Sequence, residues 1–180
     1  GLHLVVGSRH DIERKLMEVA HSDALTGLPN RMYFESRIEQ EIERSRREEL
    51  PLCFALVDLD HFKNVNDTYG HDCGDRVLKH VATVLSGSVR AQDVLCRIGG
   101  EELAIIMPNT TIEDALPTLE RVRASISDCP VLWKSNTITV TASIGVSELS
   151  VQSSSYDKLY ETADKNLYIA KENGRNQVVV

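Results

Sequence analysis

Two adjacent glutamates follow two adjacent glycines in the segment RIGGEELAIIMP, which covers residues 97–108. Neighbouring carboxylates repel each other, and their pKa values rise unless a cation lies between them. The pair therefore predicts either a solvated turn or a site that faces a cation or a reaction. Apolar runs at residues 94–98 and 102–107 flank the two glycines, which predicts a hairpin whose turn uses positive φ at glycine.

A second acid ends another apolar run. Residues 52–59 (LCFALVDL) predict a buried strand with Asp58 near its end. If this strand pairs with the hairpin, Asp58 and Glu101 meet at one edge of the sheet. Carboxylates that converge from separate strand ends are typical of a Mg²⁺ site, because Mg²⁺ prefers oxygen ligands and shares its coordination with substrate phosphates. The glycines would let a triphosphate or a base approach the backbone closely.

An ordinary surface loop is the alternative for a lone Asp58 or a lone diglycine. The polar residues of the segment DLDHFKNVNDTYGHDCGD, residues 58–75, favour a site instead, because carboxylates, amides and a lysine gather in one stretch. Within it, Asp60 and Asp67 are interpreted as residues that brace the loop. His71 is interpreted as a residue that shapes the loop and does not donate protons.

The elements that position these residues follow from hydrophobic periodicity and turn signals. Residues 11–21 predict the end of a longer helix, with a heptad-like seam of Ile12, Leu16 and Val19. Asn30 is a candidate N-cap for the next helix. Helices are expected at residues 31–48, 75–89, 112–127 and 156–173, and strands at residues 52–59, 94–98, 102–107, 138–147 and 177–180. This order predicts an α+β fold, a sheet with an antiparallel hairpin and helices packed against it.

Composition limits the classes of function. The chain has 180 residues, 42% of them hydrophobic, which fits one domain with room for a terminal helix. A net charge of −7 argues against a general nucleic-acid-binding surface. No apolar run is long enough to span a bilayer, and no signal peptide is visible. The four cysteines lack CxxC spacing, so a reducing compartment, the cytoplasm, is expected and a zinc site or disulfide framework is not.

Four segments carry a family resemblance: DALTGLPNR from Asp23, residues 58–75, RIGGEEL and KENGRN from Lys171. Together and in this order they resemble the GGDEF family of diguanylate cyclases in its GGEEF variant, here GGEEL, over residues 23–180. The resemblance implies a ferredoxin-like, palm-type fold of the nucleotidyl cyclases, with a mixed, largely antiparallel sheet flanked by helices. It implies the condensation of two GTP molecules into cyclic di-GMP with release of two pyrophosphates, in bacterial second-messenger signalling.

The resemblance also assigns residues. Asp58, Glu101 and the backbone carbonyl of Leu59 are implied ligands of Mg²⁺ or Mn²⁺. Either Glu101 or Glu102 is the candidate proton acceptor, and the sequence does not decide between them. Asn66 and Asp75 are the implied guanine readers, because an amide and a carboxylate match the polar edge of guanine. The remaining implied substrate contacts are Phe62, Lys63, Gly99, Gly100, Lys171 and Arg175.

Plainer interpretations exist for several of these residues. Lys171 and Arg175 lie near a helix C-terminus, where cations commonly complement the helix dipole. Asn66 is also compatible with an Asx turn. The family's usual Phe after the acidic pair is Leu103 here, which is expected to repack and to keep the chemistry.

Regulation and assembly are implied as well. Arg90 and Asp93 resemble the family's RxxD product site, which Arg121 would complete; a helix end with a charged loop is the alternative. A homodimer is expected for catalysis, with residues 1–21 as a signalling helix or linker and residues 22–180 as the cyclase domain. An upstream sensor, absent from this sequence, is expected and could anchor the parent protein to a membrane. The competing functions are a catalytically weak receptor for GTP or cyclic di-GMP and, less favoured, a palm-based polymerase or nucleic-acid-binding module.

Overall fold

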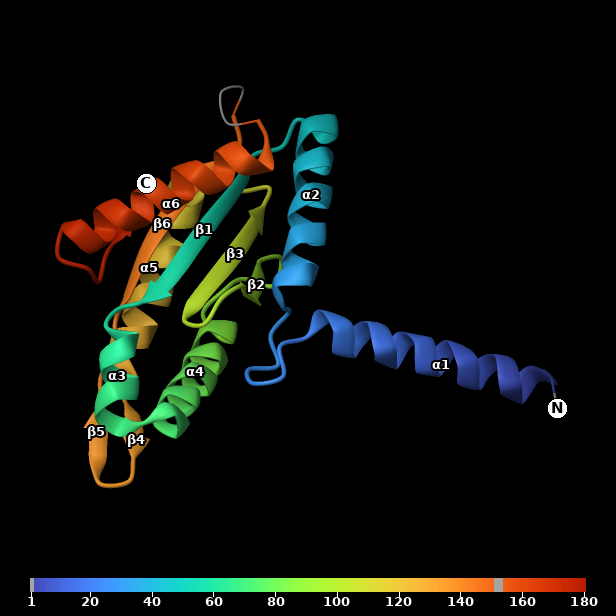
Figure 1. Ribbon diagram of the computed structural model, residues 1–180. Helices are drawn as coiled ribbons and strands as arrows, with labels where there is room; N and C mark the ends of the chain where they lie inside the picture. The colour runs from blue at the N-terminus through green and yellow to red at the C-terminus, as the bar shows by residue number, and fades with distance from the viewer. Residues whose placement is uncertain (1, 151–153) are drawn as a thin grey trace.

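The computed structural model describes residues 2–150 and 154–180. Its centre is a five-stranded sheet of order β2-β3-β1-β6-β7, in which only the β6–β7 pair is parallel (Figure 1). This mixed, largely antiparallel sheet confirms the predicted fold class. The strands are β1 (Leu52–Leu59), β2 (Val94–Arg97), β3 (Glu102–Pro108), β6 (Ala142–Glu148) and β7 (Val178–Val179), with a separate hairpin of β4 (Val131–Trp133) and β5 (Asn136–Ile138).

The helices of the described residues are α1 (Leu2–His21), α2 (Arg31–Glu48), α3 (Phe62–Tyr69), α4 (His71–Ser86), α5 (Ile112–Asp128) and α6 (Tyr156–Glu172). Four of them, α2, α4, α5 and α6, cover the two faces of the sheet. Side chains of α4 and α5 pack with Val57 and Leu103 of the sheet, whereas side chains of α2 and α6 pack with Phe54 and Leu56. Asn30 caps α2 as predicted, since its side chain accepts from the backbone N–H of Tyr33 at 3.1 Å.

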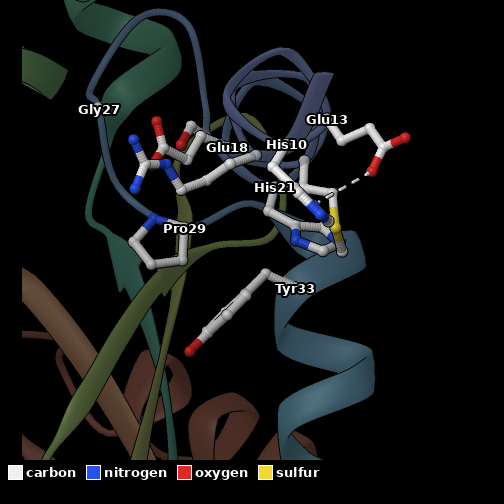
Figure 2. A pocket seen from close by; sticks show the side chains of 10 residues that line it. His10, Glu13, Glu18, His21, Gly27, Pro29 and Tyr33 are labelled. Carbon is white, nitrogen blue, oxygen red and sulfur yellow. Dashed lines mark ion pairs between the residues drawn. The ribbon is translucent and has the colours of Figure 1, made fainter. Parts of the chain in front are cut away.

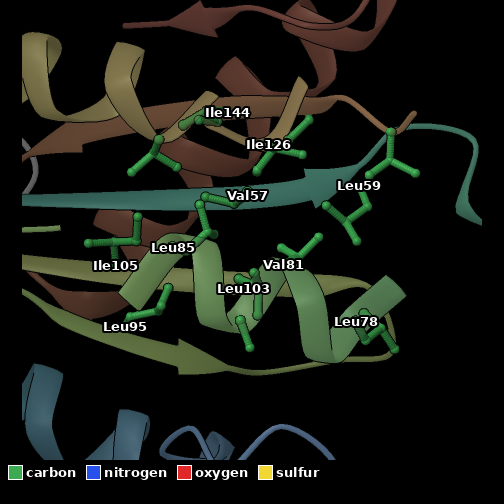
Figure 3. Packing of buried hydrophobic residues seen from close by; sticks show 14 of the residues in the cluster. Val57, Leu59, Leu78, Val81, Leu85, Leu95, Leu103, Ile105, Ile126 and Ile144 are labelled. Carbon is green, nitrogen blue, oxygen red and sulfur yellow. The ribbon is translucent and has the colours of Figure 1, made fainter. Parts of the chain in front are cut away.

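The apolar layer between the sheet and α4 fixes where the acidic edge lies. Figure 3 shows Val57 and Leu103 on the strands facing Val81 and Leu85 on α4. Leu103, the residue that replaces the family's usual Phe, is only 2% exposed. It therefore fills the core beside the acidic pair, as expected from its apolar character.

Close packing of α6 on the sheet depends on Gly145 of β6. A Cβ at this position would lie 2.8 Å from Leu167 Cα and would collide with the carbonyl oxygen of Ala163. Both contacts involve the α6 backbone, which cannot move aside without lifting the helix. The absence of a side chain at Gly145 therefore sets the height of α6, and with it the position of Lys171 near its end.

Two stretches differ from the sequence-based expectation. Residues 60–75 were expected as loop with Asp75 at a helix start, but they form α3 and the first turn of α4, which begins at His71. The abundance of polar residues hid the helical period, because α3 buries only Phe62 and Val65. Gly70 separates the two helices with φ of 92°, a value that favours glycine. The strand expected over residues 138–147 is split into β5 and β6.

The helix α1 extends away from the domain in Figure 1. It begins before residue 11, as expected for the end of a longer helix, and the seam residues Ile12, Leu16 and Val19 are 55%, 64% and 76% exposed. Among residues 2–150 and 154–180, no helix combines the length and apolar character that a membrane span requires.

Candidate active site

The sheet register brings the acidic residues to one edge. Asp58 of β1 lies directly opposite Glu102 of β3, and the backbone N–H of Leu59 donates to the carbonyl oxygen of Glu101 at 3.3 Å. The predicted convergence of Asp58 and Glu101 at the end of paired strands is thus seen in the backbone. Like charges placed directly opposite each other destabilise a sheet, so this pairing is not explained by stability.

The electrostatic environment of this edge is unfavourable for carboxylates. Burial, with further contributions from Glu101 and Asp60, raises the pKa of Asp58 although Lys171 Nζ donates to its Oδ2 at 2.8 Å. Burial likewise raises the pKa of Glu102, and the neighbouring carboxylate of Asp58 raises it further. The edge therefore holds more negative charge than its cations balance, and an added cation would stabilise it.

This donor set fits a divalent cation. Asp58 and Glu101 offer carboxylate oxygens, and Leu59 at the end of β1 offers a backbone carbonyl. In the described part of the chain no group of three His, Cys, Asp or Glu side chains is placed to bind a metal. Two carboxylates suffice for Mg²⁺ when substrate phosphates and waters supply the other ligands, so the chemistry of the edge suits Mg²⁺ bound together with a nucleotide.

A hollow of about 370 Å³ lies beside Glu101, within the range typical of small-molecule sites. Helices α3 and α4 form one side of it and the β2–β3 turn forms the other. Six residues predicted from the sequence to contact substrate or metal lie together in its lining, along with three that were not. The nine residues are Phe62, Lys63, Asn66, His71, Asp75, Leu78, Arg97, Gly100 and Glu101.

The remaining predicted site residues lie outside this lining. Lys171 bonds Asp58 on the α6 side of the edge. Arg175 is exposed in the turn after α6, where its φ is 64°. Gly99 is partly exposed in the β2–β3 turn. The structure thus brings the two base-reading residues, Gly100 and Glu101 together, and leaves Gly99 and the C-terminal cations outside the lining of the hollow.

The backbone conformation of the two glycines in the β2–β3 turn differs from the prediction. Neither Gly99 nor Gly100 has positive φ, so the expectation that the turn uses positive φ at glycine is wrong. Space is the reason supported by the structure: a Cβ at Gly99 would lie 3.2 Å from Cβ of Glu102, and Gly100 opens onto the hollow. Glycine here keeps room for the acidic pair and for a ligand.

Arg97 is a residue that sequence reasoning missed. Its Nε donates to the carbonyl oxygen of Gly99 at 3.1 Å, and its Nη2 donates to that of Gly100 at 2.8 Å. Its Nη1 pairs with the Asp23 carboxylate at 3.1 Å, in the turn that follows α1. Arg97 therefore links the β2–β3 turn, which contains Glu101, to the turn that follows α1. The available signal was an arginine directly beside a diglycine turn.

Asp60 braces the fold, as predicted. It is 5% exposed and accepts hydrogen bonds from the hydroxyls of Thr141 and Ser143, both at 2.7 Å, and from the backbone N–H of Asn176 at 3.0 Å. Asp67, which was expected to do the same, is exposed on α3. His71 begins α4 and lines the hollow.

The predicted product site is an ion pair in this structure. Arg90 donates to both carboxylate oxygens of Asp93, at 3.0 and 2.8 Å, and its Nη2 also donates to the hydroxyl of Thr110. The Asp93 side chain is 0% exposed and that of Arg90 is 25% exposed. Arg121 lies nearby, since its Nε donates to the carbonyl oxygen of Ser88 at 2.9 Å. The carboxylate of Asp93 is thus already used by Arg90.

A second and larger hollow, of about 640 Å³, lies between α1 and the turn before α2. Figure 2 shows His10, His21 and Tyr33 around it, with His10 4.0 Å from Glu13. It is lined by α1, the following turn and α2, whereas the acidic edge lies at the ends of β1 and β3. No local sequence pattern indicates this hollow, because its shape depends on how α1 is set against the following turn and α2.

A largely antiparallel sheet with carboxylates at one edge and a nucleotide-sized hollow beside them defines the palm-type class of the nucleotidyl cyclases. The chain belongs to the GGDEF family: the family model described as "Diguanylate cyclase, GGDEF domain" matches residues 20–177.

Individual relatives support the same family assignment. The chain is 42% identical over 173 residues to the response regulator PleD of Caulobacter vibrioides, covering 95% of this chain and 38% of PleD. Among solved structures it is similar to the diguanylate cyclase SiaD of Pseudomonas aeruginosa, solved with its activator SiaC, at 40% identity and a TM-score of 0.88, covering 98% of this chain and 68% of that one. It is also similar to the coiled coil and GGDEF domain of DgcB from Caulobacter crescentus in complex with c-di-GMP, at 30% identity and a TM-score of 0.87, covering 98% and 97%.

Proposed function

We propose that this domain is a diguanylate cyclase that condenses two GTP molecules into cyclic di-GMP and releases two pyrophosphates. The observation that carries the proposal is the hollow in which Asn66, Asp75 and Glu101 come together from three separate elements. Membership of the GGDEF family supports the same activity. The chain spans well under half the length of curated relatives such as PleD, so the activity is proposed for the domain and not for a whole protein.

Nucleotide choice is assigned to Asn66 and Asp75. A carboxylate accepts hydrogen bonds from the N1–H and amino group of guanine, and an amide both donates and accepts. Adenine presents a different donor pattern, so the pair favours GTP over ATP. Phe62 and Lys63 at the start of α3 are assigned to the phosphates, together with Lys171 and Arg175.

Catalysis of phosphoryl transfer needs alignment and charge neutralisation more than covalent chemistry. Asp58, Glu101 and the carbonyl of Leu59 would hold Mg²⁺, which would supply positive charge beside the phosphates. Glu102, whose raised pKa makes it a better base than an ordinary carboxylate, accepts the proton of the attacking 3′-hydroxyl; Glu101 is the alternative acceptor. Lys171 positions the carboxylate of Asp58 by donating to its Oδ2.

One domain offers one GTP site, so two domains must face each other for the reaction. The exposed seam of Ile12, Leu16 and Val19 on α1 is proposed to hold the two together. Product inhibition is proposed at Arg90, Asp93 and Arg121. Because Asp93 is buried under Arg90, we assign it the role of orienting the guanidinium, and a hydrogen bond from Asp93 to guanine requires this pair to open.

Incubation with GTP and Mg²⁺ followed by chromatography tests the activity directly. Cyclic di-GMP should form, and the rate per chain should rise with protein concentration because a dimer is required. A rate per chain that stays flat over a hundredfold dilution, with sedimentation showing monomer, would exclude the two-domain mechanism. GTP binding without any cyclic di-GMP would instead identify a receptor.

Asp75→Ala tests nucleotide choice. The variant should bind GTP about tenfold or more weakly than the parent and ATP about as weakly as the parent, because the Asp75 carboxylate makes its hydrogen bonds to guanine alone. Asp72→Ala is the matched control, since Asp72 is exposed in the first turn of the same helix and does not line the hollow. Calorimetry that gives equal GTP affinities for Asp75→Ala and the parent removes Asp75 from the base site.

A further inference from the structure

Gly74 lies on α4 where this helix packs against α3, next to two residues that line the hollow. It is the fourth residue of α4 and is buried, and its N–H makes the helix bond to the carbonyl oxygen of Gly70 at 3.2 Å. A Cβ built on Gly74 would overlap Oδ1 of Asn66 and would lie 3.0 Å from its Cγ. The amide of Asn66 therefore occupies the space that any side chain at residue 74 would need.

The neighbour displaced by a side chain at Gly74 is functional and flexible. Both overlapping atoms belong to the end of the Asn66 side chain, and the third neighbour is Cζ of Phe62 at 3.2 Å. Asn66 and Phe62 both line the hollow. A methyl group would thus push the Asn66 amide aside while the α4 backbone stays in place. Gly145 is the opposite case, because a Cβ there meets the backbone of α6.

Helix stability does not explain glycine at this position. Glycine in a helix interior costs up to about 1 kcal/mol relative to alanine. The φ of Gly74 is not positive, so alanine is compatible with its backbone. Helix stability therefore gains nothing from glycine here, and what the missing side chain provides is room for the Asn66 amide and, to a smaller extent, for the ring of Phe62.

We propose that Gly74 is a positioning residue for nucleotide recognition: by lacking a side chain it seats the Asn66 amide at the wall of the hollow, and so it sets the preference for guanine. This rests on the proposed function, in which Asn66 reads the base. Gly74→Ala should therefore keep or raise the stability of the domain and lower its preference for GTP over ATP.

The test compares Gly74→Ala, Asn66→Ala and the double variant with the parent by calorimetry with GTP and ATP and by thermal unfolding. Gly74→Ala should keep or raise the Tm and should lower GTP affinity about tenfold without lowering ATP affinity. In the Asn66→Ala background the same substitution should leave GTP affinity unchanged. Gly87→Ala is the matched control: Gly87 follows the same helix, and a Cβ there makes only an ordinary 3.6 Å contact with the Val84 carbonyl oxygen.

The outcomes distinguish the role of Gly74 from the proposed function. If Asn66→Ala weakens GTP binding but Gly74→Ala binds like the parent, the role of Gly74 is wrong and the proposed function stands. Equal losses from Gly74→Ala in the presence and absence of Asn66 would also overturn it, because the effect would not act through the amide. A parent that binds no GTP, or an Asn66→Ala variant that binds it normally, overturns the assignment of Asn66 and the role of Gly74 with it.

Discussion

The acidic edge and the Arg90–Asp93 turn bring charged side chains together in opposite ways. At the edge, Asp58 lies opposite Glu102 and accepts a hydrogen bond from Lys171, and the pKa values of Asp58 and Glu102 are nevertheless raised. In the turn, Arg90 makes two hydrogen bonds to Asp93, and that pairing raises the pKa of the guanidinium. The turn is electrostatically complete, whereas the edge has a surplus of negative charge.

This difference indicates what each region is for. A surplus of carboxylates costs stability and is retained where a cation or a phosphate will arrive. A complete ion pair stabilises its own turn and gives a ligand access only through the exposed part of Arg90. The following predictions test the contrast, beginning with the largest expected effect.

Glu101→Gln should reduce turnover about 100-fold or more and leave the Tm close to that of the parent. The substitution removes one charge from the proposed metal site, and removal of a comparable electrostatic contact costs about this much. Initial rates of cyclic di-GMP formation and thermal unfolding check it. Glu39→Gln, at an exposed position of α2, is the control. A variant with more than about a tenth of the parental rate would contradict the metal assignment.

Asp93→Ala should act in the other direction, on stability. It removes a buried acceptor from Arg90, and hydrogen bonds to charged groups contribute about 2 kcal/mol to the free energy of unfolding. Urea unfolding measures the loss, with Asp128→Ala at the exposed end of α5 as the control. Equal stability of Asp93→Ala and the parent would mean that the turn does not depend on this ion pair.

Arg90→Lys should raise the cyclic di-GMP concentration needed for half-inhibition about tenfold, because lysine keeps the charge and loses the planar fork of donors. It should also destabilise the domain less than Asp93→Ala, since a cation remains beside Asp93. Inhibition curves with added product check the first effect and urea unfolding the second. Unchanged product sensitivity would leave the turn a purely structural ion pair.

Glu102→Gln should change the pH dependence of stability, the smallest of these effects. A carboxyl whose pKa is raised by folding stabilises the folded state below its unfolded pKa, and this contribution is lost as pH rises through the folded pKa. Glutamine does not titrate, so the Tm of Glu102→Gln minus that of the parent should grow between about pH 4 and pH 8 in metal-free buffer. Glu39→Gln should show no such growth. A Tm difference that stays constant with pH would show that folding does not raise the pKa of Glu102.

Much of the fold was predictable because local patterns agree with it. The strand at residues 52–59 and the helix at residues 31–48 have the predicted bounds, since the first is a continuous apolar run of strand length and the second has a helical apolar period. Helix α3 and the first turn of α4 were not distinguished from loop, whereas the rest of α4 was expected as a helix from residue 75. The reason is that α3 buries only two side chains and its polar residues line the hollow. A functional segment gives a weak structural signal for this reason.

For the site, the sequence by itself determined which residue types are present and their order, since the GGEEL segment and its companions are local in the chain. Only the tertiary structure decided which of them meet. It placed Asp58 opposite Glu102 through strand register, set Arg97 between Asp23 and the glycine turn, and put Asn66 against Gly74. Each of these contacts joins residues from different elements, and their separation is fixed by helix and strand packing that no local pattern encodes. The space available at residue 74 likewise depends on tertiary structure. Glycine is needed there because of the Asn66 amide, eight positions earlier, which only the packing of α3 against α4 brings close.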